Sequence, residues 1–311
     1  MKSVPLGTSD LQVPAVVAGM MRIEELSDAE VRALYDASLA AGVTFFDHAD
    51  IYGSAPAHVC EARFAEALRL SSSEREQIVL QSKAGIVKEG PYFDFSYDHI
   101  IEAVDGSLAA LRTDYLDVLL LHRPDALVEP EEVARAFDEL AGAGKVRHFG
   151  VSNHTPAQLE LLKRYVTQPL VANQLQLSIT HAPIVAQGLA MNMIGVDQSI
   201  SRDLGVLDYC RLHDITVQAW SPFQAGFFTG VFLGNPDYAA LNVVIDRLAA
   251  EYQVTPEAIA TAWILRHPAK MQVVLGTTNP QRLKNAAAGA EVDLTRAQWY
   301  ELSVAAGHLV P

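Results

Sequence analysis

The chain has 311 residues, of which half are hydrophobic and 19% are charged. This composition excludes a disordered chain, which has low hydrophobicity and high charge. Asp and Glu outnumber Lys and Arg by 37 to 23, and the resulting net charge of −14 argues against nucleic acid or an anionic membrane surface as a partner.

The sequence carries no clear signal for export, disulfide cross-linking or membrane insertion. Its two cysteines, Cys60 and Cys210, are too few for a disulfide framework, which fits a reducing compartment. The first ten residues, MKSVPLGTSD, have an early proline and lack the apolar core of a signal peptide. No run approaches 18 uncharged apolar residues. We therefore expect a soluble protein of the cytoplasm with no membrane span.

Eight short apolar runs predict the strands of a parallel sheet. Each run is rich in Val, Leu, Ile or Phe and is nearly continuous, which is typical of strands buried on both faces. The runs cover residues 16–18, 43–46, 78–80, 116–121, 146–151, 170–175, 216–220 and 272–276.

Helix start signals lie between these runs. Ser27, with a glutamate three residues later, predicts a capping box. Thr155, Thr255 and Asn279 each precede a proline and predict a side-chain cap at the start of a helix. Pro130 opens a further helix. The chain therefore alternates eight strands with about eight helices.

This alternation predicts an α/β fold, a single (β/α)8 barrel domain that spans residues 1–311. Residues 6–14 precede the first strand and are expected to form a hairpin under the barrel. Long loops are expected at 180–206 and 221–238, after the sixth and seventh strands. The second loop carries four phenylalanines, Phe223, Phe227, Phe228 and Phe232. An open doubly wound sheet is the alternative, although the chain lacks the G-x-G-x-x-G motif of a nucleotide-binding one.

Side chains with acid–base chemistry follow neighbouring strands of this predicted barrel. Barrel enzymes place their chemistry at the carboxyl ends of the strands. Asp47, Lys83 and His122 end the second, third and fourth strands, and Tyr52 lies in the loop after Asp47. A tyrosine has a pKa of about 10, and a lysine cation beside the phenol would lower that pKa. The four side chains therefore predict a general acid for a carbonyl oxygen.

Four segments together resemble the aldo-keto reductase family. They are FFDHADIYG at 45–53, QSK at 81–83, LLLHRPD at 119–125 and GKVRHFGVSN at 144–153, and the likeness runs along nearly the whole chain. It is strongest to bacterial reductases that carry His-Ala-Asp-Ile-Tyr-Gly. The resemblance implies a barrel that binds NADPH without a Rossmann fold and reduces an aldehyde or ketone with hydride from the nicotinamide.

The resemblance also implies roles for individual residues. Asp47, Tyr52, Lys83 and His122 match the family's catalytic tetrad, in which the tyrosine is the general acid and the histidine orients the carbonyl. Within the cofactor site, Ser152 and Asn153, joined by Gln174, would hold the nicotinamide carboxamide, and Trp220 would stack on the nicotinamide ring. The residues implied to bind the cofactor are Gly19, Met20, Met21, Ser152, Asn153, Gln174, Trp220, Ser221, Pro222, Phe223, Gly276, Thr277, Thr278, Arg282 and Asn285.

Arg282 bears on the choice between the two nicotinamide cofactors. It matches the family's arginine for the 2′-phosphate, which favours NADPH over NADH. The helix expected to begin at Pro280 would offer free backbone N–H groups to the same anion. Gly276 and Asn285 depart from the residues that are common in the family at those places.

Three other interpretations stay open. The first is a catalytically slow NADPH-binding sensor or regulatory subunit of the same barrel family. The second is a Schiff-base enzyme with Lys83 as its nucleophile. The third is a metal-dependent hydrolase, although no close His/carboxylate cluster stands out and we expect no metal. The expected partner is a small carbonyl compound, whose identity the sequence leaves open together with the oligomeric state.

Overall fold

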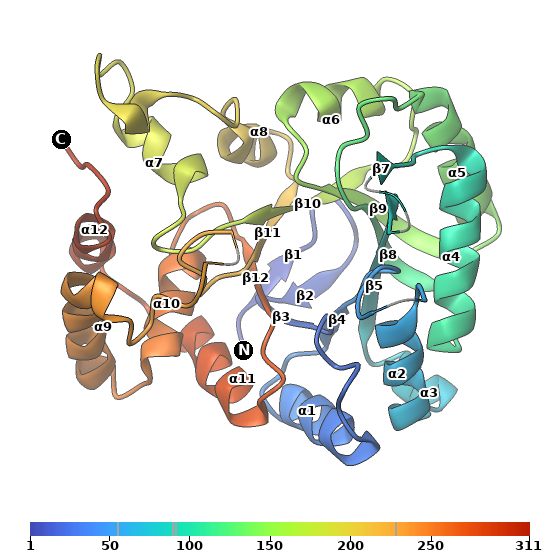
Figure 1. Cartoon of the computed structure of the whole chain (residues 1–311), viewed down its shortest axis with the longest axis horizontal. Coiled ribbons are helices and arrows are strands. Elements are labelled where there is room, and N and C mark those ends of the chain that lie inside the picture. The colour runs from blue at the N-terminus through green and yellow to red at the C-terminus, as the bar shows by residue number, and fades with distance from the viewer. Residues whose placement is uncertain (55, 89, 91, 228) are drawn as a thin grey trace.

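Eight parallel strands close into a barrel in the order in which they follow along the chain (Figure 1). The computed structural model describes residues 1–54, 56–88, 90, 92–227 and 229–311. The barrel strands are β3 (Val16–Gly19), β4 (Phe45–Asp47), β5 (Val79–Ala84), β8 (Leu116–Leu121), β9 (Val146–Ser152), β10 (Leu170–Gln176), β11 (Thr216–Trp220) and β12 (Gln272–Leu275). The predicted (β/α)8 barrel is confirmed, and all eight predicted runs contribute a strand.

Helices surround the barrel, and most of them follow a strand. They are α1 (Asp28–Ala40), α2 (Val59–Leu68), α3 (Ser72–Arg75), α4 (Tyr97–Leu111), α5 (Pro130–Gly142), α6 (Pro156–Lys163), α7 (Pro183–Leu189), α8 (Val206–Leu212), α9 (Ala239–Tyr252), α10 (Pro256–Leu265), α11 (Pro280–Ala287) and α12 (Arg296–Ala305). Short 3₁₀ turns add η1 (Asp197–Ser199), η2 (Pro236–Tyr238) and η3 (Ala288–Glu291).

Three of the four predicted helix caps form. Ser27 and Thr155 make reciprocal capping boxes, and the Asn279 side chain accepts two backbone N–H groups. The cap predicted at Thr255 is wrong. The N–H of Ala258 donates to the Thr255 carbonyl oxygen at 3.0 Å, and the Thr255 hydroxyl is buried without a hydrogen-bond partner in the described part of the chain.

A hairpin closes the amino-terminal end of the barrel, as the sequence predicts, although its strands flank residues 6–11. Strands β1 (Ser3–Pro5) and β2 (Gln12–Pro14) pair antiparallel, and both are visible through the barrel in Figure 1. Leu6 is fully buried among interior side chains of the barrel. Gly7 has a φ of +56°, and a Cβ there would collide with the carbonyl of Val171, so the turn fits closely against β10.

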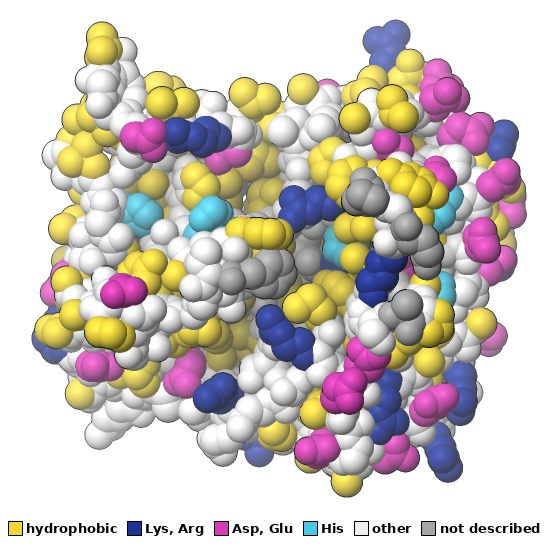
Figure 2. Space-filling model, in the orientation of Figure 1, with side chains coloured by type: hydrophobic (Ala, Val, Ile, Leu, Met, Phe, Trp, Pro, Cys, Tyr) yellow, Lys and Arg dark blue, Asp and Glu magenta, His cyan; other side chains and the backbone are white. Residues whose placement is uncertain are grey.

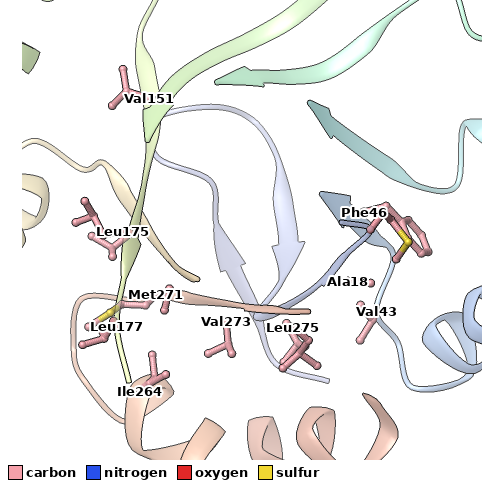
Figure 3. Packing of buried hydrophobic residues seen from close by; sticks show 14 of the residues in the cluster. Ala18, Val43, Phe46, Val151, Leu175, Leu177, Ile264, Met271, Val273 and Leu275 are labelled. Carbon is pink, nitrogen blue, oxygen red and sulfur yellow. The ribbon is translucent and has the colours of Figure 1, made fainter. Parts of the chain in front are cut away.

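The alternation of side chains along each strand decides what faces the barrel interior. On β12, Val273 and Leu275 belong to the outer core between strands and helices (Figure 3). Gln272 and Val274 therefore face inward. By the same alternation, Phe46 packs outside with Tyr35 at a ring distance of 5.2 Å, whereas Asp47 faces the interior. Polar side chains thus reach the barrel interior near the carboxyl ends of the strands.

The two long segments after β10 and β11 are partly ordered into secondary structure. The segment 180–206 contains α7 and η1. In the segment 221–238, Phe232 is fully buried and Gln224 pairs with Val231 in an isolated bridge. Phe228 lies outside the described residues. Nowhere in the described ranges is a helix both long and apolar enough to cross a membrane.

Candidate active site

Asp47 and Lys83 form a buried ion pair at the carboxyl ends of adjacent strands. β4 and β5 are paired with Asp47 opposite Gln81, so Lys83, two residues farther along β5, faces the same side of the sheet as Gln81. The Lys83 Nζ lies 2.7 Å from each oxygen of Asp47, and both residues are about 1% exposed. Nζ also donates to the carbonyl oxygen of His48 at 2.8 Å. The ammonium is therefore fixed in position by three acceptors.

Tyr52 brings its hydroxyl group to this ion pair. The phenol oxygen lies 2.9 Å from Lys83 Nζ and 3.5 Å from Asp47 Oδ2. Tyr52 sits in the loop after β4, where its N–H donates to the carbonyl of Ala49 at 3.1 Å. Gly53 follows with a φ of +92°, which lets the chain turn away toward α2. The turn presents the hydroxyl at the inner end of a cavity.

The pKa of Tyr52 departs from the sequence-based expectation. Burial is the largest influence, and the charge of Asp47 adds to it, so the pKa of Tyr52 is raised well above its usual value. The expected lowering by Lys83 is therefore wrong for the protein alone. Burial also lowers the pKa of Lys83, while the neighbouring Asp47 carboxylate acts in the opposite direction. The phenol stays protonated across the physiological range.

His122 completes the group on the β8 side. Its backbone N–H donates to the carbonyl oxygen of Ala84 at 2.9 Å. Its imidazole ring packs edge-on against the ring of Tyr52, with 6.0 Å between the ring centroids. Burial, and then the charges of Lys83 and Arg123, place the pKa of His122 well below 6.5. The imidazole is therefore neutral, with one N–H to donate. Its Nδ1 is buried and has no hydrogen-bond partner among the residues described.

A cavity of about 920 Å³ opens above these four residues, within the size range of small-molecule sites. Asp47, Tyr52 and His122 line it, and Lys83 lies just below. Thirteen of the fifteen predicted cofactor residues line it as well: Gly19, Met21, Ser152, Asn153, Gln174, Trp220, Ser221, Pro222, Phe223, Gly276, Thr277, Thr278 and Arg282. The exceptions are Met20, whose side chain is buried in the outer core, and Asn285, which binds Gln281.

One wall of the cavity is built where β9 and β11 end. Asn153 and Ser221 follow these strands with left-handed φ values of +61° and +54°. Such backbone is uncommon for residues other than glycine and clusters at functional sites. The Trp220 indole N–H donates to the Asn153 side chain at 3.2 Å, and Asn153 donates to Ser152 Oγ at 2.8 Å. Trp220 is thereby held against the cavity.

Gln174 lies deeper in the barrel than the residues of this wall and faces the ion pair of Asp47 and Lys83. Its side-chain NH₂ donates to Asp47 Oδ1 at 3.0 Å and to Gln218 at 3.1 Å. Its expected contact, the carboxamide of a nicotinamide, would have to use the remaining side-chain oxygen. The residue therefore touches both the cavity and the polar interior of the barrel.

The far rim of the cavity is built by the loop between β12 and α11. A Cβ on Gly19 would lie 2.9 Å from the carbonyl oxygen of Leu275, so the two strand ends approach closely. Arg282 is exposed on this rim, with no acidic partner within the described ranges. The expectation that the start of α11 offers free backbone N–H groups to an anion is wrong. Asn279 Oδ1 already accepts those of Gln281 and Arg282, at 2.9 and 3.0 Å.

Sequence reasoning missed two arginines and a glutamate that also line the cavity: Arg22, Arg123 and Glu257. Arg22 donates to the carbonyl oxygen of Gly276 at 2.7 Å. Arg123 lies 5.9 Å above the Trp220 ring, and in the described structure it has neither a hydrogen bond nor an ion pair. The two arginines could have been predicted from their positions, because Arg22 follows Met21 and Arg123 follows His122 in the sequence. Figure 2 shows Lys and Arg side chains around the central hollow of this face.

Neither of the other predicted chemistries gains support from the geometry. Lys83 is paired with Asp47 and is inaccessible below the cavity floor, which does not suit a nucleophile. The described residues contain no group of three or more His, Cys, Asp or Glu side chains that could hold a metal ion.

Comparison with known proteins agrees with this geometry. The family model described as "Aldo/keto reductase family" matches residues 15–305. "Uncharacterized oxidoreductase YcsN" of Bacillus subtilis is 36% identical over 97% of each chain. "6-dehydroglucose reductase" of Agrobacterium fabrum is 36% identical over 94% of each chain.

A solved structure shares the fold. The crystal structure of the thermostable aldo-keto reductase Tm1743 with the inhibitor epalrestat has a TM-score of 0.76 at 22% identity, and the match covers 98% of this chain and all of that one. The family model and the sequence relatives carry the assignment. The chain belongs to the aldo/keto reductase family, whose enzymes are oxidoreductases that act on carbonyl or alcohol groups with a nicotinamide cofactor.

Proposed function

We propose that the protein is an NADPH-dependent reductase of an aldehyde or ketone, in which Tyr52 is the proton donor. One observation carries the proposal: the Tyr52 hydroxyl lies 2.9 Å from the ammonium of Lys83, which is itself bonded to both oxygens of Asp47, at the inner end of a large cavity. This is the arrangement of a general acid with a fixed cation beside it.

The proton comes from the Tyr52 hydroxyl. Because the pKa of Tyr52 is raised, the phenol is protonated before reaction and can give its proton to the carbonyl oxygen as negative charge develops there. The phenolate left behind is stabilised by the ammonium 2.9 Å away. Asp47 keeps that ammonium in place.

His122 supplies a second contact for the same oxygen. Its imidazole is neutral and lines the cavity beside Tyr52, so its N–H can donate to a carbonyl oxygen without carrying charge. A neutral donor orients the substrate but leaves the proton transfer to Tyr52. We therefore assign it to orientation.

The residues of the cavity fit a nicotinamide cofactor. When bound, that group supplies the hydride that reaches the carbonyl carbon. Trp220, held by Asn153, offers an aromatic face, and the close approach of Gly19 to Leu275 leaves backbone without side chains at the rim. Arg22 and Arg282 line the opposite end, where they would meet the phosphates. Arg282 would bind the 2′-phosphate and favour NADPH.

The substrate side of the cavity combines apolar and polar groups. Ile86, Phe227 and Trp220 offer apolar surface, and Arg123 offers five N–H donors next to His122. A small polar carbonyl compound fits this combination. The name of the Agrobacterium relative makes a sugar aldehyde the first compound to include in a screen.

The test combines binding and turnover on the same preparation. NADPH and NADH are titrated against tryptophan fluorescence, and NADPH oxidation is then followed with a panel of sugar aldehydes, dicarbonyls, ketones and quinones. We expect tighter binding of NADPH than of NADH and turnover with at least one carbonyl class. Tight binding with no turnover on the panel would instead favour the sensor or regulatory subunit, and no binding of either cofactor would overturn the reductase.

A further inference from the structure

Four glutamine side chains lie in the barrel interior, and two of them donate hydrogen bonds to Asp47. They are Gln81 on β5, Gln174 on β10, Gln218 on β11 and Gln272 on β12, and none is more than 3% exposed. Bulky branched apolar side chains usually fill such a barrel. A buried amide is costly unless its hydrogen bonds are made. The presence of four buried amides therefore indicates that they have a role beyond filling the barrel.

The amides are joined in one continuous ladder. Gln81 donates to Asp47 Oδ1 at 2.6 Å and to Gln218 Oε1 at 2.9 Å. Gln218 donates back to Gln81 at 3.1 Å and onward to Gln272 at 2.9 Å. Gln272 donates to the carbonyl oxygen of Pro14 at 2.8 Å. The ladder thus runs from Asp47 to the hairpin that closes the barrel.

Both ends of the ladder fix the direction of its amides. The Asp47 carboxylate and the Pro14 carbonyl can only accept hydrogen bonds. Gln81 must therefore point its NH₂ group at Asp47, and Gln272 must point its NH₂ group at Pro14. Gln218 lies between them and satisfies both with its NH₂ and its oxygen. A single arrangement satisfies every group, so the network is rigid.

We propose that Gln81 and Gln218 are positioning residues for the proton-donating tyrosine, with Gln272 as the anchor of their ladder. The inference rests on the proposed role of Tyr52. Gln81 and Gln174 hold Asp47 Oδ1, which leaves Oδ2 facing Tyr52. The carboxylate cannot rotate without breaking these bonds, and its orientation sets where the Lys83 ammonium meets the phenol.

The ladder also adds hydrogen bonds to a buried carboxylate. Hydrogen bonds to charged groups are stronger than those between neutral groups. Removing Gln81 takes away one such bond and frees the carboxylate to move. Removing Gln218 acts on Asp47 only through Gln81 and Gln174, and removing Gln272 acts one bond further away. The effect on catalysis should fall along the ladder.

The experiment replaces Gln81, Gln218 and Gln272 one at a time by methionine, which has a similar length and no donor. Gln174 stays unchanged because it lines the cavity. We expect kcat to fall by about tenfold to a hundredfold in Gln81→Met, by about threefold to tenfold in Gln218→Met and by about twofold in Gln272→Met. The dissociation constant for NADPH should stay constant, because none of the three lines the cavity. Thermal stability should fall similarly in all three, because each is fully buried.

Opposite results would overturn the proposal. A purely structural ladder would give losses of kcat that follow the losses of thermal stability rather than the distance from Asp47. Wild-type kcat in Gln81→Met would have the same meaning. Tyr52→Phe, measured alongside, separates the two proposals: if it keeps wild-type kcat, the proposed function fails, whereas if it is inactive and Gln81→Met is not impaired, only the ladder fails.

A second variant, Gln81→Glu, keeps the shape of the side chain and serves if the methionine variant does not fold. Two carboxylates that share a site cannot both ionise easily, so one of them has a raised pKa. The introduced carboxyl group could still donate to Asp47 while it is protonated, whereas its ionised form could not. We expect kcat of this variant to fall as the pH rises through that pKa, in a step that wild type lacks. A profile without this step would contradict the proposal.

Other titratable groups near Asp47 and Lys83 are present in both wild type and the variant. They are Tyr52, His48, Asp50 and Glu61.

Discussion

The two ends of the cavity differ in how their charges are compensated. At the inner end, Lys83 and Asp47 are buried and bonded to each other. At the rim, Arg282 is exposed and makes no ion pair in the described part of the chain. The fold therefore compensates the charge of Lys83 by itself, whereas the rim keeps Arg282 available for a ligand. Mutations at the two ends should accordingly affect different steps.

The largest effect is expected at the inner end. Lys83→Met would leave the Asp47 carboxylate buried without its cation, which costs roughly 3–5 kcal/mol of unfolding free energy. Without the ammonium beside Tyr52, kcat should fall by about 10²–10⁴. Denaturant unfolding and steady-state kinetics check both numbers.

The matched control is Lys163→Met, which breaks an exposed ion pair with Glu160. Such pairs contribute about 0–1 kcal/mol. If the two lysine variants lost the same stability, the Asp47–Lys83 pair would not have the importance we give it.

A smaller and more selective effect is expected at the rim. Arg282→Ala should raise the dissociation constant of NADPH by about tenfold to a hundredfold, since one charge-assisted contact to the 2′-phosphate is lost. NADH binding should change by less than about twofold. Fluorescence titration of both cofactors measures the difference. Arg164→Ala, an exposed arginine outside the cavity, is the control, and equal weakening of both cofactors by Arg282→Ala would remove the 2′-phosphate assignment.

The smallest effect concerns His48, which is buried beside the inner end. Burial lowers the pKa of His48 to about 4, against opposing influences from Glu61 and Asp47, and its ring has no hydrogen-bond partner in the described structure. Between about pH 4 and pH 6.5 the unfolded chain therefore binds a proton that the folded protein does not, so His48 makes the unfolding free energy rise with pH in this window.

His48→Leu should remove that contribution, which is at most about 1.4 kcal/mol per pH unit. Urea unfolding at several pH values within the window gives the slopes for wild type and variant. Val243→Ala, at an exposed position without a titratable group, should leave the slope unchanged. An unchanged slope in His48→Leu would mean that the folded protein takes up the proton at this histidine.

The sequence predicted the barrel because its signals are local. Each apolar run and each cap such as Ser27 or Asn279 acts within a few residues, and eight repeats of the same pattern leave few architectures. The residues that we propose as the catalytic group were predicted for a similar reason, because Asp47, Lys83 and His122 end consecutive barrel strands, and strand ends meet at one rim.

Other features depended on contacts between distant segments and were therefore missed. The glutamine ladder joins residues up to 258 positions apart, and Gln81 alone is an ordinary strand residue. The rise in the pKa of Tyr52 depends on burial, which the spacing of Tyr52 and Lys83 does not reveal. The side-chain cap at Thr255 does not form because the N–H group of Ala258 donates to the backbone carbonyl oxygen of Thr255 instead.

The most direct test of the account is a single-turnover measurement on the NADPH complex, made with a carbonyl compound that wild type reduces. Tyr52→Phe removes only the hydroxyl that lies 2.9 Å from Lys83. We predict that this variant binds NADPH as tightly as wild type and oxidises it about 10²–10⁴ times more slowly in the presence of the carbonyl compound. Oxidation at the wild-type rate would contradict the account, because the proton would then come from another group.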